Sequence, residues 1–151
     1  MKPTLLLASA VTPDGRPLTL HGHDGDYLIR VAGVELMSTR QHRSEERLAE
    51  LGCGPLRDRP RSRVLVGGLG LGFTLRATLP LLRRDATVVV AELMQPVVDW
   101  NRDPSFGLGG DALADPRVEV VVGDVADAIR TGRFDAILLD VDNGQIGRAH
   151  V

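Results

Sequence analysis

The sequence has few cysteine and aromatic residues. Among its 151 residues there is one cysteine, Cys53, together with three Phe, one Tyr and one Trp. A single cysteine excludes an internal disulfide bond and a zinc site built from several thiolates, and it is typical of a reducing cytoplasm. With so few rings the core must be aliphatic, and a platform of aromatic side chains for nucleic-acid bases is not expected.

The sequence also lacks an excess of one charge and a long apolar run. Eighteen Lys and Arg residues face twenty Asp and Glu residues, and the resulting net charge of −2 does not suggest a nucleic-acid partner. No apolar run approaches the roughly 18 residues of a membrane-spanning helix. The histidines His21, His23 and His42 are not spaced with carboxylates as metal ligands are. We therefore expect a cytoplasmic protein without a nucleic-acid, membrane or metal partner.

Residues 1–40 have the pattern of a β-meander. Short apolar stretches alternate with turns, of which Pro13-Asp14-Gly15 is the clearest, because Pro presets φ and Gly permits φ > 0. Residues 41–62 are predicted to form a helix and a linker. The helix is expected over 41–51, with Gly52 at the position of a helix stop, and the Pro- and Arg-rich linker follows it.

From residue 63 the pattern changes to alternating strands and helices. Four runs rich in Val, Ile or Leu are predicted strands, over 64–66, 87–92, 118–122 and 134–140. Apolar strands separated by helices imply a parallel sheet that is covered on both faces. The predicted fold class is α/β, with a core over 63–144 that follows a small N-terminal β-hairpin region.

The first of these strands is followed by a glycine-rich turn. Its glycines are Gly67, Gly68, Gly70 and Gly72. In open α/β sheets ligands bind beyond the carboxyl ends of the strands, and glycines there let backbone N–H groups approach a ligand. The spacing is G-x-G-x-G and not the dinucleotide fingerprint G-x-G-x-x-G. A tight turn without a ligand would need the same glycines.

Acidic residues end the other three predicted strands. Glu92 is placed to accept the ribose hydroxyls of a nucleoside, and Asp124 can accept a hydrogen bond from an adenine amino group. Asp140 and Asp142 can stabilise a cationic centre or accept a proton from an amine. Each acid also has a simpler interpretation. Glu92 can be a helix-capping or surface acid, Asp124 a helix N-cap, and the pair part of a turn.

Four segments hold these strands and their acidic or glycine-rich ends. They are VLVGGLGLGFTLRATL (64–79), VVVAELMQPVVDWNR (88–102), DPRVEVVVGDVADAI (115–129) and FDAILLDVDNG (134–144). Together they resemble the successive motifs of spermidine synthases and their spermidine synthase-like relatives, in the S-adenosylmethionine-dependent methyltransferase superfamily. Residues 33–51 and the β-rich segment before them are similar to the first helix and small β domain of that family.

The resemblance implies a Rossmann-like methyltransferase-type core and a transferase of polyamine biosynthesis. The co-substrate would be S-adenosylmethionine or its decarboxylated form, and no metal would take part. The group would be transferred to a small-molecule amine or to another acceptor. A neutral amine would attack the carbon beside the sulfonium and expel a neutral thioether. The full-length protein would be an enzyme and could form a homodimer.

The same resemblance assigns roles to individual residues. Gly68, Gly70 and Gly72, with Gly67 before them, would line the amino-acid or aminopropyl tail of the nucleoside. Glu92 would hold the ribose and Asp124 the adenine. Asp140, together with Asp142, would face the sulfonium and the incoming amine, and Glu46 would contact the substrate.

The sequence departs from the spermidine synthase pattern at three places. Gly70 stands where these enzymes usually have the aspartate of G-G-G-D-G-G, which grips the aminopropyl amine. Ser44 stands where these enzymes have a tyrosine before the glutamate of the first helix, so in that helix only Glu46 matches their pattern. The fourth strand ends DVDNG (140–144) where D-S-x-D-P is usual. An S-adenosylmethionine-dependent small-molecule methyltransferase therefore stays an alternative, as does a non-catalytic relative or inactive fragment.

The chain stops shortly after the fourth predicted strand, whereas the core of that superfamily continues with further strands. We therefore expect a C-terminally truncated chain, with strands one to four of an incomplete core. Residues 146–151 can be encoded by ATC GGA AGA GCA CAC GTC, the start of a widely used sequencing adapter, whose preceding AG completes a CAG codon for Gln145. We expect 145–151 to be a non-native read-through tail.

Overall fold

The computed structural model of the chain describes residues 3–39, 43–108 and 110–140. These residues form two compact units, one before residue 40 and one from Arg43 onward. No helix within the described ranges is long and apolar enough to cross a membrane.

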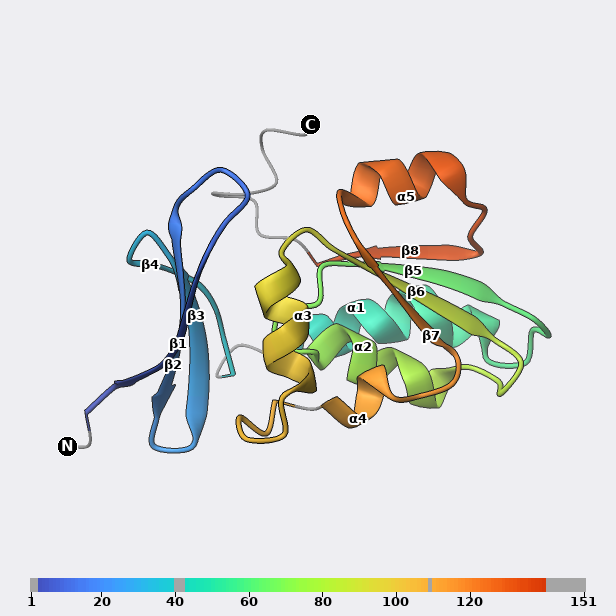
Figure 1. Cartoon of the computed structure of the whole chain (residues 1–151). Coiled ribbons are helices and arrows are strands. Elements are labelled where there is room, and N and C mark those ends of the chain that lie inside the picture. Colours follow the sequence, from blue (N-terminus) through green and yellow to red (C-terminus); the bar gives the residue numbers. More distant parts are fainter. Residues whose placement is uncertain (1–2, 40–42, 109, 141–151) are drawn as a thin grey trace. The chain divides into compact units, whose positions relative to one another are not determined.

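The first unit is a four-stranded antiparallel sheet in the order β1-β2-β3-β4. Its strands are β1 (Leu5–Val11), β2 (Pro17–His23), β3 (Asp26–Val31) and β4 (Val34–Ser38), each joined to the next by a short turn (Figure 1). Leu18 pairs with Val31 and Leu20 pairs with Ile29, and all four side chains are buried. Alternation along each strand places these four on one face. The antiparallel sheet predicted for this segment is confirmed.

The second unit is built on a parallel sheet in the order β7-β6-β5-β8. Its strands are β5 (Arg63–Gly67), β6 (Thr87–Glu92), β7 (Val118–Val122) and β8 (Ala136–Leu139). The predicted strands 87–92 and 118–122 are confirmed residue for residue. The fourth strand, Ala136–Leu139, is shorter than the predicted 134–140. Before it, Phe134 packs against the cluster of Leu65, Val89 and Ala91, and the Asp135 carboxylate accepts a hydrogen bond from the Arg63 N–H.

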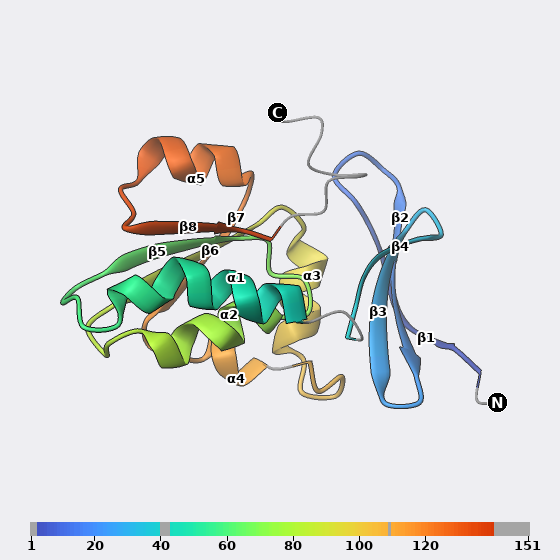
Figure 2. The same ribbon diagram turned by 180° about the vertical axis from the view of Figure 1, so that it is seen from behind.

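Helices cover both faces of this sheet. They are α1 (Arg43–Cys53), the short η1 (Gly54–Leu56), α2 (Phe73–Thr78), η2 (Leu79–Leu81), α3 (Gln95–Arg102), α4 (Gly110–Leu113) and α5 (Val125–Thr131). Figures 1 and 2 show α5 on one face of the sheet, with α1 and α2 on the other. Strand order explains this division. After β5 the chain adds β6 and then β7 on one side of β5, and it afterwards crosses back to add β8 on the other side. Because crossovers between parallel strands are right-handed, α5, which connects β7 to β8, lies on the face opposite the earlier helices.

The core between sheet and helices is aliphatic, as the scarcity of rings predicted. Val64, Val66, Val88 and Val90 are fully buried in the two central strands. On the α5 face, Leu65, Val89 and Ala91 form a cluster against Val125, Ala128 and Phe134. Parallel strands buried on both faces need such continuous apolar runs. The predicted α/β class is confirmed.

Gly52 has a different role from the predicted helix stop. Helix α1 continues through Gly52 to Cys53. A Cβ built on Gly52 would lie only 2.2 Å from Cδ2 of the buried Leu138 in β8. The glycine therefore allows α1 to approach the sheet closely, and it does not end the helix.

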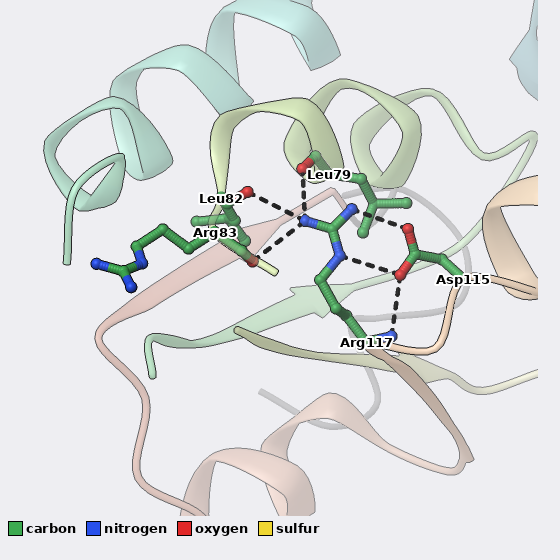
Figure 3. A network of polar contacts seen from close by, with 5 residues as sticks. All are labelled: Leu79, Leu82, Arg83, Asp115 and Arg117. Atoms are coloured by element: carbon green, nitrogen blue, oxygen red, sulfur yellow. Dashed lines mark hydrogen bonds and ion pairs between the residues drawn. The ribbon is translucent and has the colours of Figure 1, made fainter. Parts of the chain in front are cut away.

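Arg117, just before β7, joins the turn that it shares with Asp115 to the end of the α2–η2 segment (Figure 3). Its guanidinium forms two hydrogen bonds with the Asp115 carboxylate, at 3.0 and 2.8 Å. Its Nη1 also donates to the carbonyl oxygens of Leu79, Leu82 and Arg83, at 2.8, 3.1 and 3.3 Å. These carbonyls lie at the end of the α2–η2 segment, where helices leave acceptors without a full set of partners; the Leu79 and Arg83 carbonyls also accept the N–H groups of Leu82 and Ala86, at 3.3 and 3.2 Å. The fork of Arg117 supplies further donors.

Candidate functional site

The predicted site residues of four segments meet at the carboxyl ends of the parallel strands. Gly67 of β5 pairs in register with Ala91 of β6 and Leu139 of β8. The glycine loop, residues 67–72, therefore begins at the same edge of the sheet as Glu92 and Asp140. The Asp140 N–H donates to the Gly67 carbonyl at 2.8 Å, and the Gly123 N–H donates to the Glu92 carbonyl at 2.9 Å. Each strand end is therefore bonded to its neighbour.

Glu92 is buried and bound to the glycine loop. Its Oε1 accepts hydrogen bonds from the N–H groups of Leu69 and Gly70, at 2.9 and 3.4 Å. Its Oε2 accepts the N–H of Met94 at 3.0 Å, and the residue is 6% exposed. Burial raises the pKa of this carboxyl above its usual value, against the opposing effect of the N–H donors. The surface-acid interpretation of Glu92 is therefore wrong.

Glycine is required in the loop for two different structural reasons. Gly68, Gly70 and Gly72 have φ of +94°, +53° and +84°, a region that other residues rarely adopt. Gly67 has no such φ, but a Cβ there would lie 2.7 Å from Val125 of α5. The turn geometry and the packing of α5 each require glycine, whether or not the loop binds a ligand.

Two side chains that the sequence analysis did not single out hold the carbonyl oxygens of this loop. Asn101 of α3 donates through Nδ2 to the Gly70 carbonyl at 2.7 Å. Arg76 of α2 donates through Nη2 to the Leu71 carbonyl at 3.1 Å. Asn101 is 2% exposed in a helix whose other buried residues are Val97, Val98 and Trp100. A polar residue on an apolar helix face was the one available signal.

Asp124 caps a helix. Its Oδ1 accepts the N–H of Ala126 at 2.9 Å, at the first turn of α5. The N-cap interpretation is thereby confirmed, since Asp is among the residues preferred there. A contact of the same side chain with adenine stays a prediction.

Asp140 lies directly after β8 and is held by Thr74. The Thr74 hydroxyl, 1% exposed in α2, donates to Oδ2 of Asp140 at 2.7 Å. Burial raises the pKa of the Asp140 carboxyl above its usual value, the Thr74 hydrogen bond lowers it, and the charge of Glu45 raises it further. A half-buried carboxyl of this kind accepts a proton more readily than an exposed one.

The remaining predicted site residues are not brought into this arrangement. Glu46 lies on α1 and is exposed, and its neighbour Glu45 is the α1 acid whose charge acts on Asp140. Asp142 and the tail 145–151 lie outside the described residues, so their predicted roles stay predictions. Within the described ranges, no group of three or more His, Cys, Asp or Glu side chains is arranged to hold a metal ion.

A cavity lies beside the end of α3. Its volume is about 550 Å³, and it is lined by residues of the segment from Asn101 to Ala114, among them Arg102, Asp103 and Asp111. Asn101 therefore borders both this cavity and the glycine loop.

Sequence comparison finds no protein-family model and no curated protein that matches the chain. Solved structures do match it. Spermidine synthase from Thermotoga maritima superposes with a TM-score of 0.73 at 22% identity, over 93% of this chain and 48% of its own. The chain has the fold of spermidine synthases. A spermidine synthase in complex with the transition-state analogue AdoDATO gives a TM-score of 0.72 at 22% identity, over 91% of this chain and 47% of its own.

The spermidine synthase fold accounts for both units of the chain, the antiparallel N-terminal sheet and the parallel sheet with its helices. The chain spans about half the length of these two structures. The resemblance found in the motifs and the resemblance in three dimensions therefore point to the same fold.

Proposed function

We propose that this chain belongs to a spermidine synthase-like transferase of polyamine biosynthesis, in the S-adenosylmethionine-dependent methyltransferase superfamily. It would bind decarboxylated S-adenosylmethionine, or S-adenosylmethionine itself, and transfer the aminopropyl group to a small-molecule amine. The observation that carries the proposal is the pair of strand-end acids bonded to one glycine loop. Glu92 accepts the Leu69 and Gly70 N–H groups, and the Asp140 N–H donates to Gly67.

Glu92 would contact the ribose. Its carboxylate already accepts the N–H groups of Leu69, Gly70 and Met94, and a backbone hydrogen bond of Leu93 also lowers its pKa. A carboxylate has about four acceptor positions, so a ribose hydroxyl would share a position with one of these donors or displace it. Asp124 at the end of β7 and the glycines Gly67, Gly68, Gly70 and Gly72 at the end of β5 would complete the nucleoside site.

Asp140 would act on the incoming amine. The amine nitrogen attacks the carbon beside the sulfonium, a C–N bond forms, the C–S bond breaks, and the thioether leaves with the bonding electrons. The new ammonium then loses a proton. Asp140 can accept it, because its pKa is raised by burial and it is oriented by the Thr74 hydroxyl. Asp142 and Glu46 are proposed to contribute to amine binding.

The test compares two nucleosides on the longer protein from which we propose this chain derives, with residues 1–151 in parallel. Isothermal titration should show tighter binding of decarboxylated S-adenosylmethionine than of S-adenosylmethionine. With a diamine acceptor, the wild type should release the thioether, and Asp140→Asn should lower the rate. Asp127→Asn, an exposed acid of α5, is the matched control. We further propose a cytoplasmic enzyme that forms a homodimer at full length.

One observation favours a second candidate, an S-adenosylmethionine-dependent methyltransferase. Gly70 offers no side chain to the tail of the nucleoside, so the loop has no carboxylate of its own to repel a ligand carboxylate. Tighter binding of S-adenosylmethionine than of the decarboxylated form would support this candidate and contradict aminopropyl transfer. Binding of neither nucleoside would indicate a non-catalytic relative.

A further inference from the structure

The conformation of the glycine loop depends on contacts with neighbouring segments. Three of the five residues from Gly68 to Gly72 are glycines with positive φ. Glycine loses more backbone freedom on ordering than any other residue. Within the loop the Gly72 N–H donates to the Leu69 carbonyl at 2.8 Å, and the other hydrogen bonds that hold the loop come from its surroundings.

The N–H groups of the loop are held from β6. The Gly68 N–H donates to the Ala91 carbonyl at 2.8 Å. The N–H groups of Leu69 and Gly70 donate to Glu92, as described above. The side of the loop that faces β6 is thus fixed by one strand and one carboxylate.

The carbonyl groups of the loop are held from α3 and α2. Asn101 donates to the Gly70 carbonyl at 2.7 Å and to the Val97 carbonyl at 2.8 Å. Both partners are carbonyl oxygens, so the amide atom that faces them must be the nitrogen, and both of its hydrogens are used. The bond to Val97 lies within α3, but the bond to Gly70 contributes nothing to that helix.

Arg76 makes the second attachment. Its guanidinium donates to the Leu71 carbonyl at 3.1 Å and to the Leu108 carbonyl at 2.8 Å, and it stacks on the Phe73 ring at 4.7 Å from the centroid. One side chain therefore connects the loop with the segment that follows α3. Its planar fork suits two carbonyls at fixed positions.

We propose that Asn101 and Arg76 are positioning residues that hold the glycine loop in the conformation in which it receives the tail of the nucleoside. The part of this inference that concerns the ligand rests on the proposed function. Burial argues for such a role, because an amide 2% exposed is retained in a core only where its hydrogen bonds are satisfied. The two residues reach the loop from different helices and act on successive carbonyls.

The first experiment measures the loop without a ligand. Amide hydrogen exchange of residues 67–73 is compared in the wild type, in Asn101→Leu and in Gln95→Leu. Gln95 is an exposed amide on the same helix, bonded to Asp99. Loss of the Gly70 attachment should speed exchange of the loop amides about tenfold in Asn101→Leu, with no change in Gln95→Leu. Unchanged exchange in a folded Asn101→Leu would overturn the proposal.

A second variant keeps the test decisive if Asn101→Leu does not fold. Arg76→Met retains a flexible apolar stem against Phe73 and removes the guanidinium that holds Leu71. Its loop amides should also exchange faster, and unchanged exchange in this variant would contradict the proposal in the same way. In the wild type, the side-chain amide of Asn101 should exchange more slowly than that of Gln95.

The second experiment separates positioning of the tail from general stability. Titrations use S-adenosylmethionine, decarboxylated S-adenosylmethionine and 5′-methylthioadenosine, which lacks the tail beside the loop. Asn101→Leu should weaken binding of the two tailed nucleosides by about fivefold, and binding of methylthioadenosine by much less. An equal loss for all three would overturn the positioning role. If the wild type binds none of them, the proposed function fails, and hydrogen exchange alone decides whether Asn101 and Arg76 hold the loop.

Discussion

The hydroxyl of Thr74 donates a 2.7 Å hydrogen bond to Oδ2 of Asp140. Thr74 is buried in α2, and Asp140 lies directly after β8. The bond fixes the direction of a carboxyl whose pKa is raised by burial, so the proton acceptor of the proposed reaction is oriented before any substrate binds.

Thr74→Val should therefore impair the proposed transfer without unfolding the protein. The hydroxyl lowers the pKa of Asp140, so its removal should raise that pKa and move the acidic limb of the pH–rate profile to higher pH. A lost hydrogen bond to a charged group should reduce the rate at neutral pH by about tenfold. Thr78→Val is the matched control, because Thr78 is equally buried in α2 and donates to the Thr74 carbonyl. A profile that does not move would contradict this role of Thr74.

Glu45→Gln should act on Asp140 in the opposite direction. The negative charge of Glu45 raises the pKa of Asp140, so its removal should lower that pKa and move the acidic limb to lower pH. The shift should shrink at high salt, because salt screens charges that are open to solvent. Glu50→Gln, an exposed acid on the same helix, is the control. Equal shifts in both variants would mean that Glu45 has no special position.

Glu92→Gln should change how stability depends on pH. Burial raises the pKa of folded Glu92, so this group stabilises the protein fully below its unfolded pKa. That contribution declines as the pH rises through the raised pKa of the folded state. Melting temperatures of wild type and variant, subtracted at each pH, isolate this dependence. Glu119→Gln, which removes an exposed acid of β7, is the control. A difference with the opposite slope would refute the burial argument for Glu92.

Arg117→Met should destabilise the second unit. The change leaves three backbone carbonyls and the Asp115 carboxylate without the guanidinium that joins them (Figure 3). We expect a loss of about 2 kcal/mol in the free energy of unfolding, measured by urea denaturation. Arg84→Met, an exposed arginine after η2, should cost much less.

The same variant should alter acid sensitivity. Arg117 holds the pKa of Asp115 below its usual value. Ionised Asp115 therefore contributes stability above its unfolded pKa, and this contribution is lost as the pH falls through the folded pKa. Arg117→Met should abolish that part of the acid dependence, and its persistence would contradict the pairing.

Gly52→Ala should destabilise the packing of α1 on β8. Alanine is better than glycine in a helix interior by about 1 kcal/mol. The added Cβ, however, would lie 2.2 Å from Cδ2 of Leu138, and overpacking of this kind costs about 1–3 kcal/mol. We expect a net loss in thermal unfolding, whereas Gly54→Ala, where a Cβ meets open space, should be nearly neutral. A stabilised Gly52→Ala would show that Leu138 moves aside without cost.

Local features of this protein were predictable from the sequence because they depend on neighbours along the chain. Runs of Val mark the strands 87–92 and 118–122, since buried parallel strands must be apolar on both faces. Asp124 before a helical stretch indicates an N-cap, because the cap bond reaches only two residues. The spacing of Gly68, Gly70 and Gly72 indicates a glycine-rich turn, and in the structure all three have positive φ.

The contacts that make these features a site were decided by the tertiary structure. Glu92 bonds to Leu69 across 23 residues, Asn101 to Gly70 across 31, and Thr74 to Asp140 across 66. No local pattern determines such pairs, because each depends on how helices and strands pack after they form. Glycine is a residue type typical of a helix stop, so the sequence suggested that role for Gly52. Only the closeness of Leu138 shows that Gly52 instead allows α1 to approach the sheet. The sequence by itself determined the elements and the types of residue at their ends; packing decided which of those residues meet.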